Sequence, residues 1–160
     1  MSNHFLNPLN RKAIQKEYAT WLAEFNWQWF VTLTFRYPPH PEQAKKYFLK
    51  WIHWINRKLY NNRYYKTSTG IFWVLALEYH KSGVIHFHAL LGDIEDLNLK
   101  LSRKDARNKW YQIAGLGRVD PIDDKLGAVT NYVSKYIVKG GEIELSPSLR
   151  KFEEQKDLGV

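Results

Sequence analysis

Hydrophobic positions recur with two different periods along the first part of the chain, and they predict a helix, a strand and a second helix. Residues 10–25 carry apolar side chains every three to four positions, which indicates a helix. Residues 27–36 are aromatic and β-branched throughout and predict a strand that ends at the stretch YPPHP. Pro41 suits the first position of a helix that we expect to run to about Tyr60. The expected core face of that helix holds Ala44, Tyr47, Phe48, Trp51, Ile55 and Leu59.

The middle of the chain is predicted to form a β-hairpin. A polar loop over 61–70 precedes two apolar strands, 71–80 and 84–91, which are separated by Lys-Ser-Gly. A three-residue loop ending in glycine is a common hairpin connection, with the glycine in the left-handed conformation. This turn sets a register in which Glu78 lies opposite His86, with their Cβ atoms about 5 Å apart.

Side chains alternate between the two faces of such a hairpin. We expect one face to lie on the core, and it carries Trp73, Leu75, Leu77, Tyr79, Ile85, Phe87, Ala89 and Leu91. The other face carries every ionisable residue of the hairpin interior, in the set Val74, Ala76, Glu78, His80, Val84, His86, His88 and Leu90. The small side chains of Ala76 and Val84 are expected to leave room above the sheet.

The remaining elements are predicted from capping and turn signals. Ser102 followed by Asp105 indicates the start of a helix that runs to about Ile113. Residues 117–122 are expected to form a short edge strand because they contain a proline. Asp123 or Asp124 is expected to cap a helix that continues to Lys139, where two glycines end it.

These elements predict an α+β fold, a single domain with a central antiparallel sheet of about five strands and flanking helices. The domain is expected to span 1–141, and the charged residues 142–160 are expected to form a loosely held tail. The chain has 160 residues, of which 44% are hydrophobic, and that composition is typical of a packed globular domain.

Composition narrows the function classes. No stretch approaches 18 consecutive apolar residues, so we expect no membrane span, and the start MSNHFLNPLN does not resemble a signal peptide. We therefore expect an intracellular, cytoplasmic protein. The net charge of +8 favours a polyanionic partner, with nucleic acid as the first candidate and an ordinary basic protein as the alternative. The chain has no cysteine, so any metal must be held by His, Asp or Glu.

Glu78, His86 and His88 are candidates for a divalent metal site with open positions for water or substrate. They converge on one face of the predicted hairpin. The alternative is a coincidental His-x-His pair on a solvent-facing sheet surface, where polar residues are ordinary. His80 lies nearer the turn, and we expect it either to contact substrate or simply to be exposed.

A second candidate cluster lies in the sequence NYVSKYIVKG. On a helix, Tyr132, Lys135, Tyr136 and Lys139 form one stripe, while Val129, Val133 and Ile137 form an apolar stripe that would pack on the sheet. A phenol is a poor nucleophile at neutral pH, but nearby lysines and a divalent ion can activate it toward a phosphodiester. The alternative is that both tyrosines are packing residues with lysine side chains running past them.

Three motifs in order resemble those of the HUH endonucleases: FVTLTF (30–35), HFH (86–88) and YVSKYIVK (132–139). More narrowly, they resemble the Rep initiators of rolling-circle replication found in plasmids and single-stranded-DNA phages. The resemblance implies that His86 and His88 bind the metal, with Glu78 as the third ligand. It implies one Mg²⁺ or Mn²⁺ ion and no small-molecule cofactor. Both Tyr132 and Tyr136 fit the family's Tyr-x-x-Lys pattern. Some phage initiators use two such tyrosines alternately, so both are candidates, and Tyr136 fits the single-tyrosine form slightly better.

The resemblance also implies a bacterial or archaeal host, the reaction and the substrate. A tyrosine would nick single-stranded DNA at an origin stem-loop, leaving a 5′-phosphotyrosyl enzyme that later rejoins the strand. The chain contains no Walker-type phosphate loop. We therefore expect it either to be the nuclease domain of a longer protein or to recruit a host helicase. Candidate DNA contacts are Arg36, Arg63, Tyr64, Tyr65, Lys66, Arg103, Lys104, Arg107, Arg118 and His80.

Three rival functions fit parts of the same pattern. A single-strand transposase of the same superfamily also carries His-x-His and a helical tyrosine. A relaxase fits less well, because relaxases usually carry a third histidine in the cluster and are larger. From a different class, a non-enzymatic basic module that binds single-stranded nucleic acid would explain the charge alone.

Overall fold

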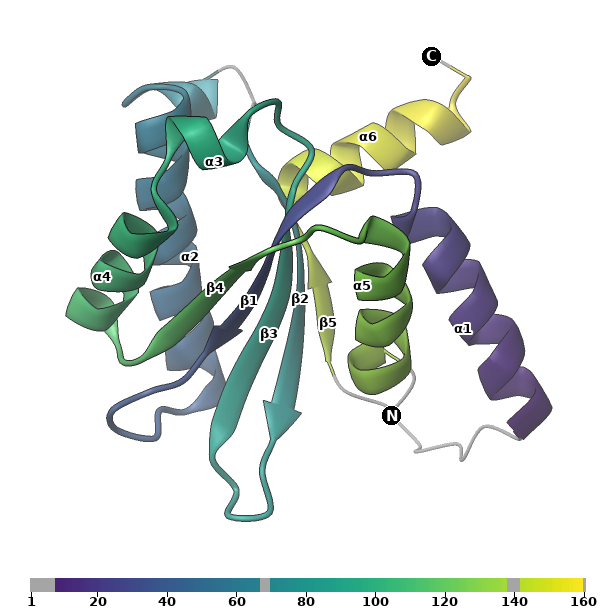
Figure 1. Ribbon diagram of the computed structural model, residues 1–160, viewed down its shortest axis with the longest axis horizontal. Coiled ribbons are helices and arrows are strands. Elements are labelled where there is room, and N and C mark those ends of the chain that lie inside the picture. The colour runs from purple at the N-terminus through teal and green to yellow at the C-terminus, as the bar shows by residue number, and fades with distance from the viewer. Residues whose placement is uncertain (1–7, 67–69, 138–141, 160) are drawn as a thin grey trace.

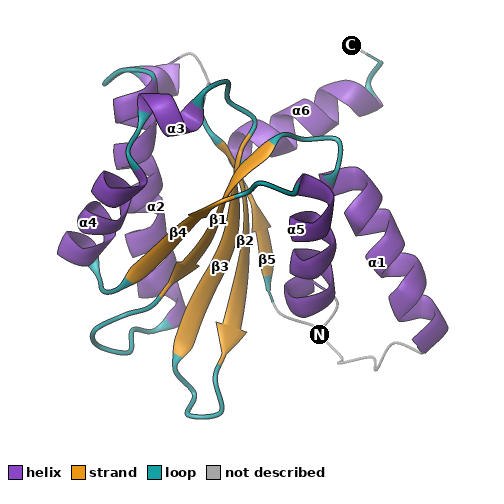
Figure 2. Ribbon diagram, viewed as in Figure 1, coloured by secondary structure: helices purple, strands orange, loops and turns teal. Residues whose placement is uncertain are grey.

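A five-stranded antiparallel sheet forms the centre of the molecule, and helices lie on both of its faces (Figures 1 and 2). The computed structural model describes residues 8–66, 70–137 and 142–159. The strands lie in the order β4-β1-β3-β2-β5, and each runs antiparallel to its neighbours. Their bounds are Trp27–Leu33 (β1), Phe72–Tyr79 (β2), Ile85–Gly92 (β3), Gly117–Pro121 (β4) and Ile143–Leu145 (β5). The prediction of a single α+β domain around one antiparallel sheet is confirmed.

The hairpin between β2 and β3 has the predicted register. Glu78 lies opposite His86, and Ala76 lies opposite His88. Gly83, the last residue of the turn, has a φ of 81°. This is the left-handed conformation that glycine adopts without a steric penalty. The turn therefore fixes which hairpin side chains share a face.

Three helices cover one face of the sheet: α2 (Pro41–Leu59), α3 (Leu97–Lys100) and α4 (Arg103–Ile113). They bury the predicted core face of the hairpin, and Phe48 packs edge-on against Trp73 and Phe87 with ring centroids 5.0 and 5.9 Å away. The prediction of burial is wrong for one residue of this face. Tyr79 is 56% exposed, because it is the final residue of β2 and adjoins the turn.

The opposite face of the sheet is also covered. Helix α1 (Pro8–Leu22), helix α5 (Lys125–Tyr132) and the π-helix η2 (Val133–Ile137) lie over it. They bury Val74, Ala76 and Leu90, so the expected open space above Ala76 is wrong. Apolar side chains of these helices fill that space instead. None of the described helices is long and apolar enough to span a membrane.

Two helix starts agree with the capping signals. The Ser102 hydroxyl accepts a hydrogen bond from the Asp105 backbone N–H at 3.2 Å, at the start of α4. The Asp124 carboxylate accepts one from the Gly127 N–H at 3.1 Å, at the start of α5. The α-helical geometry of α5 ends at Tyr132 rather than continuing to Lys139, and η2 follows it. Lys139 lies outside the described residues.

Residues 142–159 differ from the expected loose tail. β5 pairs with β2, with Leu145 opposite Val74, and α6 (Pro147–Asp157) follows it. Leu149 of α6 is fully buried. The Ser146 hydroxyl caps the helix by accepting a hydrogen bond from the Leu149 N–H at 3.2 Å. The expectation of a loose tail was wrong because it was based on the many charges of this segment and overlooked its few apolar residues that pack on the sheet.

Candidate active site

A hydrogen bond between Glu78 and His88 lies at the centre of the face covered by α5 and η2. Glu78 Oε2 and His88 Nε2 are 2.6 Å apart. On the other side of the imidazole ring, Nδ1 lies 3.4 Å from Thr32 Oγ1. His88 is only 7% exposed, whereas Glu78 reaches the surface. The imidazole is therefore held on both sides, and its carboxylate partner is open to solvent.

Tyr136 is stacked on His88. The two rings are 4.1 Å apart between centroids and 12° from parallel. Phe30 supports both rings, with centroids 6.4 Å from His88 and 6.2 Å from Tyr136. Tyr136 belongs to η2, and short π-helical segments occur frequently at functional sites. The phenol is half-buried, so one part of it lies against the histidine and another part faces solvent.

His86 and His80 lie beside this cluster, on the same face of the hairpin. Their rings are 3.7 Å apart between centroids. His86 is half-buried and His80 is exposed. The expected exposure of His80 is therefore confirmed, although its ring packs on His86, and its contact with substrate stays a prediction.

Burial is the main influence on the ionisation of both histidines in the pair. It lowers the pKa of His86 and of His88 below the ordinary value. The neighbouring His80 lowers both values further, and Glu78 partly opposes the shift. Both imidazoles are consequently neutral near pH 7, which is the form that can bind a metal ion.

Tyr132 and Tyr136, the two nucleophile candidates from the sequence, occupy different environments. Tyr132 is completely buried, and its hydroxyl lies between the Val74 and His88 carbonyl oxygens, at 3.1 and 2.9 Å. Burial raises its pKa well above the ordinary value. The predicted stripe that presents both tyrosines is therefore wrong, because Tyr132 points into the apolar interface together with Val129 and Val133.

Burial also raises the pKa of Tyr136, and the negative charge of Glu78 adds to the effect. Lys135 is exposed, and its positive charge contributes to lowering the pKa of His88. A cation, a carboxylate, an imidazole and a half-exposed phenol therefore lie close together at this surface.

The donor set of Glu78, His86 and His88 matches what a divalent ion binds, namely two neutral imidazoles and a carboxylate. In the described part of the chain, no three His, Asp or Glu side chains are gathered in an arrangement that would hold an ion as it stands. Glu78 and His88 bond to each other, and His86 packs on His80. The chemistry of the three side chains fits a metal, and ligation would replace the Glu78–His88 hydrogen bond.

Two residues of this cluster, Thr32 and Phe30, were not singled out from the sequence. They lie on β1, where Thr32 is the direct partner of His88. The alternation in WFVTLTF, in which Trp29, Val31 and Leu33 enter the core, was the signal that could have found them. Thr32 is also the partner of Arg118 on β4. Arg118, Thr32 and His88 thus form a row on one face, spanning roughly 10 Å at the usual strand spacing.

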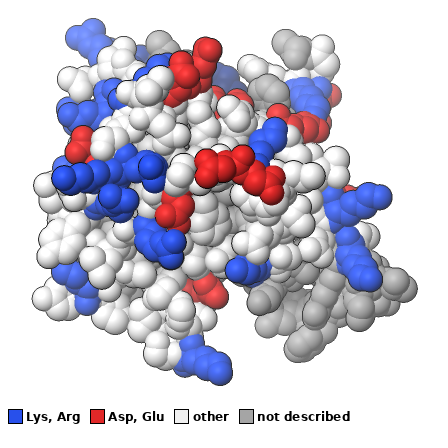
Figure 3. Space-filling model, viewed as in Figure 1, with Lys and Arg blue, Asp and Glu red and all other residues white. Residues whose placement is uncertain are grey.

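The other expected DNA contacts are spread over several surfaces. Arg103, Lys104 and Arg107 lie on α4, and Figure 3 shows Lys and Arg side chains gathered on the side of α3 and α4. Arg118 forms an ion pair with Asp120 at 3.1 Å, and both side chains remain accessible. Of the expected basic contacts, Arg118 is the one that shares a row with His88.

Two further groups of expected contacts lie elsewhere on the molecule. Arg36 donates a hydrogen bond to the Tyr111 carbonyl oxygen, and its guanidinium lies 4.8 Å from the centroid of that tyrosine ring. Residues 63–66 lie in and beside the short 3₁₀ helix η1 (Tyr64–Lys66), just after α2. There Tyr64 Oη lies 2.7 Å from His53 Nδ1.

Comparison with known proteins identified one family. Residues 28–141, most of the chain, match the family model of the replication-associated protein ORF2. No curated protein and no solved structure matched the chain. The matched range begins in β1 and extends just beyond η2, so it includes every residue of the cluster around His88.

Proposed function

Because the chain belongs to the family of the replication-associated protein ORF2, we propose that it initiates rolling-circle replication by nicking and rejoining single-stranded DNA. The observation that carries this proposal is the stacking of Tyr136 on His88, 4.1 Å between centroids. It brings a half-exposed phenol next to an imidazole–carboxylate pair and a lysine. A tyrosine that attacks a phosphodiester requires groups of these kinds beside it.

In the proposed reaction, the Tyr136 oxygen forms a bond to the phosphorus of the scissile phosphodiester. The bond between phosphorus and the 3′ oxygen breaks, the phenol releases its proton, and the departing 3′ oxygen takes one up. The products are a 5′-phosphotyrosyl enzyme and a free 3′-hydroxyl that can prime synthesis. Rejoining is the same exchange in reverse, so it needs no nucleotide hydrolysis.

Tyr136 is the proposed nucleophile in preference to Tyr132. The buried Tyr132 hydroxyl is already shared between two backbone carbonyls, and a phosphate could reach it only if α5 moved off the sheet. Tyr136 has no such anchor in the described residues. Its raised pKa means that the phenol is protonated at neutral pH, so positive charge near the phosphate must favour loss of the proton. Lys135 supplies such a charge, and Lys139 is a further candidate.

Glu78, His86 and His88 are the proposed ligands of one Mg²⁺ or Mn²⁺ ion. Such an ion, when bound, withdraws charge from the scissile phosphate and stabilises the charge that develops on it. Glu78 is exposed and can turn from His88 toward an ion. Thr32, on the other side of the imidazole, would keep the His88 ring in its orientation.

The proposed substrate is the single-stranded part of an origin stem-loop, and a host helicase is the proposed partner that unwinds the duplex ahead of synthesis. Arg118 supports this proposal, because its row leads across β1 to His88. A guanidinium at that distance suits the phosphate next to the one being cleaved. The basic side chains of α4 suit phosphates farther along the strand.

An adduct assay tests the proposed function. The protein is incubated with labelled stem-loop oligonucleotides and Mn²⁺, and covalent DNA–protein products are separated under denaturing conditions. We expect an adduct that requires the metal and disappears with EDTA. If no candidate stem-loop gives an adduct but the oligonucleotides bind, the protein is a binding module and not a nuclease.

A further inference from the structure

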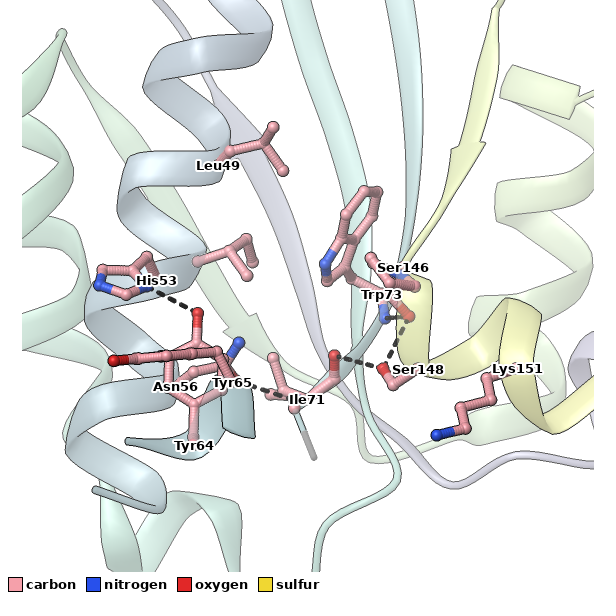
Figure 4. A pocket seen from close by; sticks show the side chains of 13 residues that line it. Leu49, His53, Asn56, Tyr64, Tyr65, Ile71, Trp73, Ser146, Ser148 and Lys151 are labelled. Carbon is pink, nitrogen blue, oxygen red and sulfur yellow. Dashed lines mark hydrogen bonds between the residues drawn. The ribbon is translucent and has the colours of Figure 1, made fainter. Parts of the chain in front are cut away.

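A second candidate site lies on the α2 side of the sheet, away from the Glu78–His88 pair. It is a cavity of about 470 Å³ between α2, η1, the start of β2 and the first turn of α6 (Figure 4). Trp73 and Ile71 come from β2 and the residue just before it, and Tyr64 and Tyr65 come from η1. Trp73 and Glu78 are five residues apart and point to opposite faces, so the cavity lies roughly 17 Å along the strand from the cluster around His88.

The walls of the cavity are flat and mostly apolar. Trp73 and Ile52 form its buried part, and Tyr64 and Tyr65 form its rim. The hydrogen bond between Tyr64 and His53 holds the Tyr64 ring in place. Tyr65 is largely exposed, and its ring meets Tyr64 edge-on. Aromatic rings presented in this way are the surfaces on which unpaired bases stack.

Asn56 gives the cavity a directional polar group. Its side chain lines the cavity and is only 5% exposed. Its Oδ1 accepts a hydrogen bond from the Ile71 N–H at 2.8 Å. No acceptor for its Nδ2 is present in the described part of the chain. A ligand acceptor placed beside Nδ2 would give this buried donor a hydrogen bond that none of the described residues supplies.

The mouth of the cavity is positively charged. Lys151 lines it and forms no ion pair with any residue that the structure describes. Figure 4 shows its amino group turned from α6 toward the space between α6 and α2. Ser148, in the first turn of the same helix, also lines the cavity, and its hydroxyl donates a hydrogen bond to the Ser146 hydroxyl at 3.2 Å. The start of a helix is also the end that attracts anions.

We propose that this cavity binds one unpaired nucleotide of the single-stranded DNA, outside the nicking site. The base would lie between the aromatic rim and Trp73, a base acceptor atom would take the Asn56 Nδ2 hydrogen, and the phosphate would face Lys151. The cavity complements three features of a nucleotide together: a flat apolar body, a hydrogen-bond acceptor and a negative group. The identification of the ligand as part of a DNA strand rests on the proposed function.

Titration of the full chain with thymidine 5′-monophosphate, followed by amide and side-chain NMR shifts, tests this site directly. We expect saturable shifts at Asn56, Tyr64, Tyr65 and Lys151, including the Asn56 side-chain amide. Thymidine without the phosphate should bind more weakly, and an oligothymidylate should shift the same residues at lower concentration. Shifts at these residues with the monophosphate but not with the oligomer would overturn assignment to a DNA strand.

Two surface variants separate the parts of the proposal. Tyr65→Ala should weaken monophosphate binding roughly tenfold, because a base stacked on an aromatic ring contributes that much. Lys151→Ala should remove most of the difference between the monophosphate and thymidine. Tyr37→Ala and Lys16→Ala, exposed residues on other surfaces, are matched controls that should change nothing.

Absence of shifts at the cavity, or equal binding by all four variants, would overturn the proposal. The titration does not depend on nicking. A protein that binds the monophosphate here but forms no DNA adduct would contradict the proposed function alone. A protein that forms the adduct but shows no shift at the cavity would contradict this second site alone.

Discussion

The phenol of Tyr136 lies flat on the imidazole of His88, with 4.1 Å between ring centroids and 12° between planes. The same imidazole bonds to Glu78 through Nε2 at 2.6 Å. A nucleophile candidate and two metal-ligand candidates therefore form one contact chain, although they come from η2, β3 and β2. The π-helix η2, the β2–β3 turn and the packing of α5 on the sheet must all form before these three side chains meet.

Replacement of Tyr132 by phenylalanine should destabilise the fold. The variant removes a buried hydroxyl that serves two backbone carbonyls, and we expect a loss of about 1–3 kcal/mol in the free energy of unfolding. Urea unfolding measures this. Tyr136→Phe is the matched control and should change stability by less than about 0.5 kcal/mol. Equal effects of the two variants would show that Tyr132 is not the anchor of α5.

Glu78→Gln should weaken Mn²⁺ binding at least about tenfold, because a charged ligand is lost while the side-chain shape is kept. The amide can still bond to His88, so the fold should be retained. Isothermal titration with Mn²⁺ measures the affinity. Glu24→Gln, which removes a carboxylate paired with Lys156, is the control and should bind Mn²⁺ like the unaltered chain. Unchanged affinity of the Glu78 variant would exclude it as a ligand.

The pH dependence of metal binding follows from the lowered pKa values of His86 and His88. A lowered pKa keeps an imidazole neutral at neutral pH, so protons compete with the metal only in more acidic solution. We expect Mn²⁺ affinity to be nearly constant between about pH 8 and pH 7 and to fall below about pH 6. A steady fall from pH 8 to pH 7 would mean that the histidines are protonated near neutrality and would contradict the assignment.

Arg118→Ala should weaken binding of the origin oligonucleotide and reduce the salt dependence of binding by about one phosphate contact. The row that joins Arg118 through Thr32 to His88 is the reason for this expectation. Fluorescence anisotropy at several salt concentrations measures both quantities. Lys16→Ala, a charge removed from α1, is the control. If both variants lose the same affinity, Arg118 contributes only to the general charge of the protein.

The hairpin could be predicted from the sequence because its determinants are local. Lys81, Ser82 and Gly83 form a turn of known geometry, and alternation then fixes the partners of Glu78 and the face of His88. Caps at Ser102 and Asp124 were predictable for the same reason, since one side chain and a backbone N–H three residues later determine each of them.

The covering of the second sheet face could not be predicted from the same signals. The polar appearance of the face around Glu78 and His86 suggested that it was open, although Val74, Ala76 and Leu90 belong to it as well. Whether a helix lies over those three depends on contacts distant in sequence. The burial of Tyr132 follows from this packing, because an aromatic ring next to Val129 and Val133 is covered only if α5 lies on the sheet. Local periodicity carries no such information.

Mass spectrometry of the covalent DNA–protein adduct tests the central claim most directly. The adduct formed with a stem-loop oligonucleotide and Mn²⁺ is digested, and the peptide that carries the nucleotide is sequenced. The account predicts a 5′-phosphotyrosyl link on Tyr136 and no adduct at all in Tyr136→Phe. A link on Tyr132, or an adduct that survives in Tyr136→Phe, would contradict it.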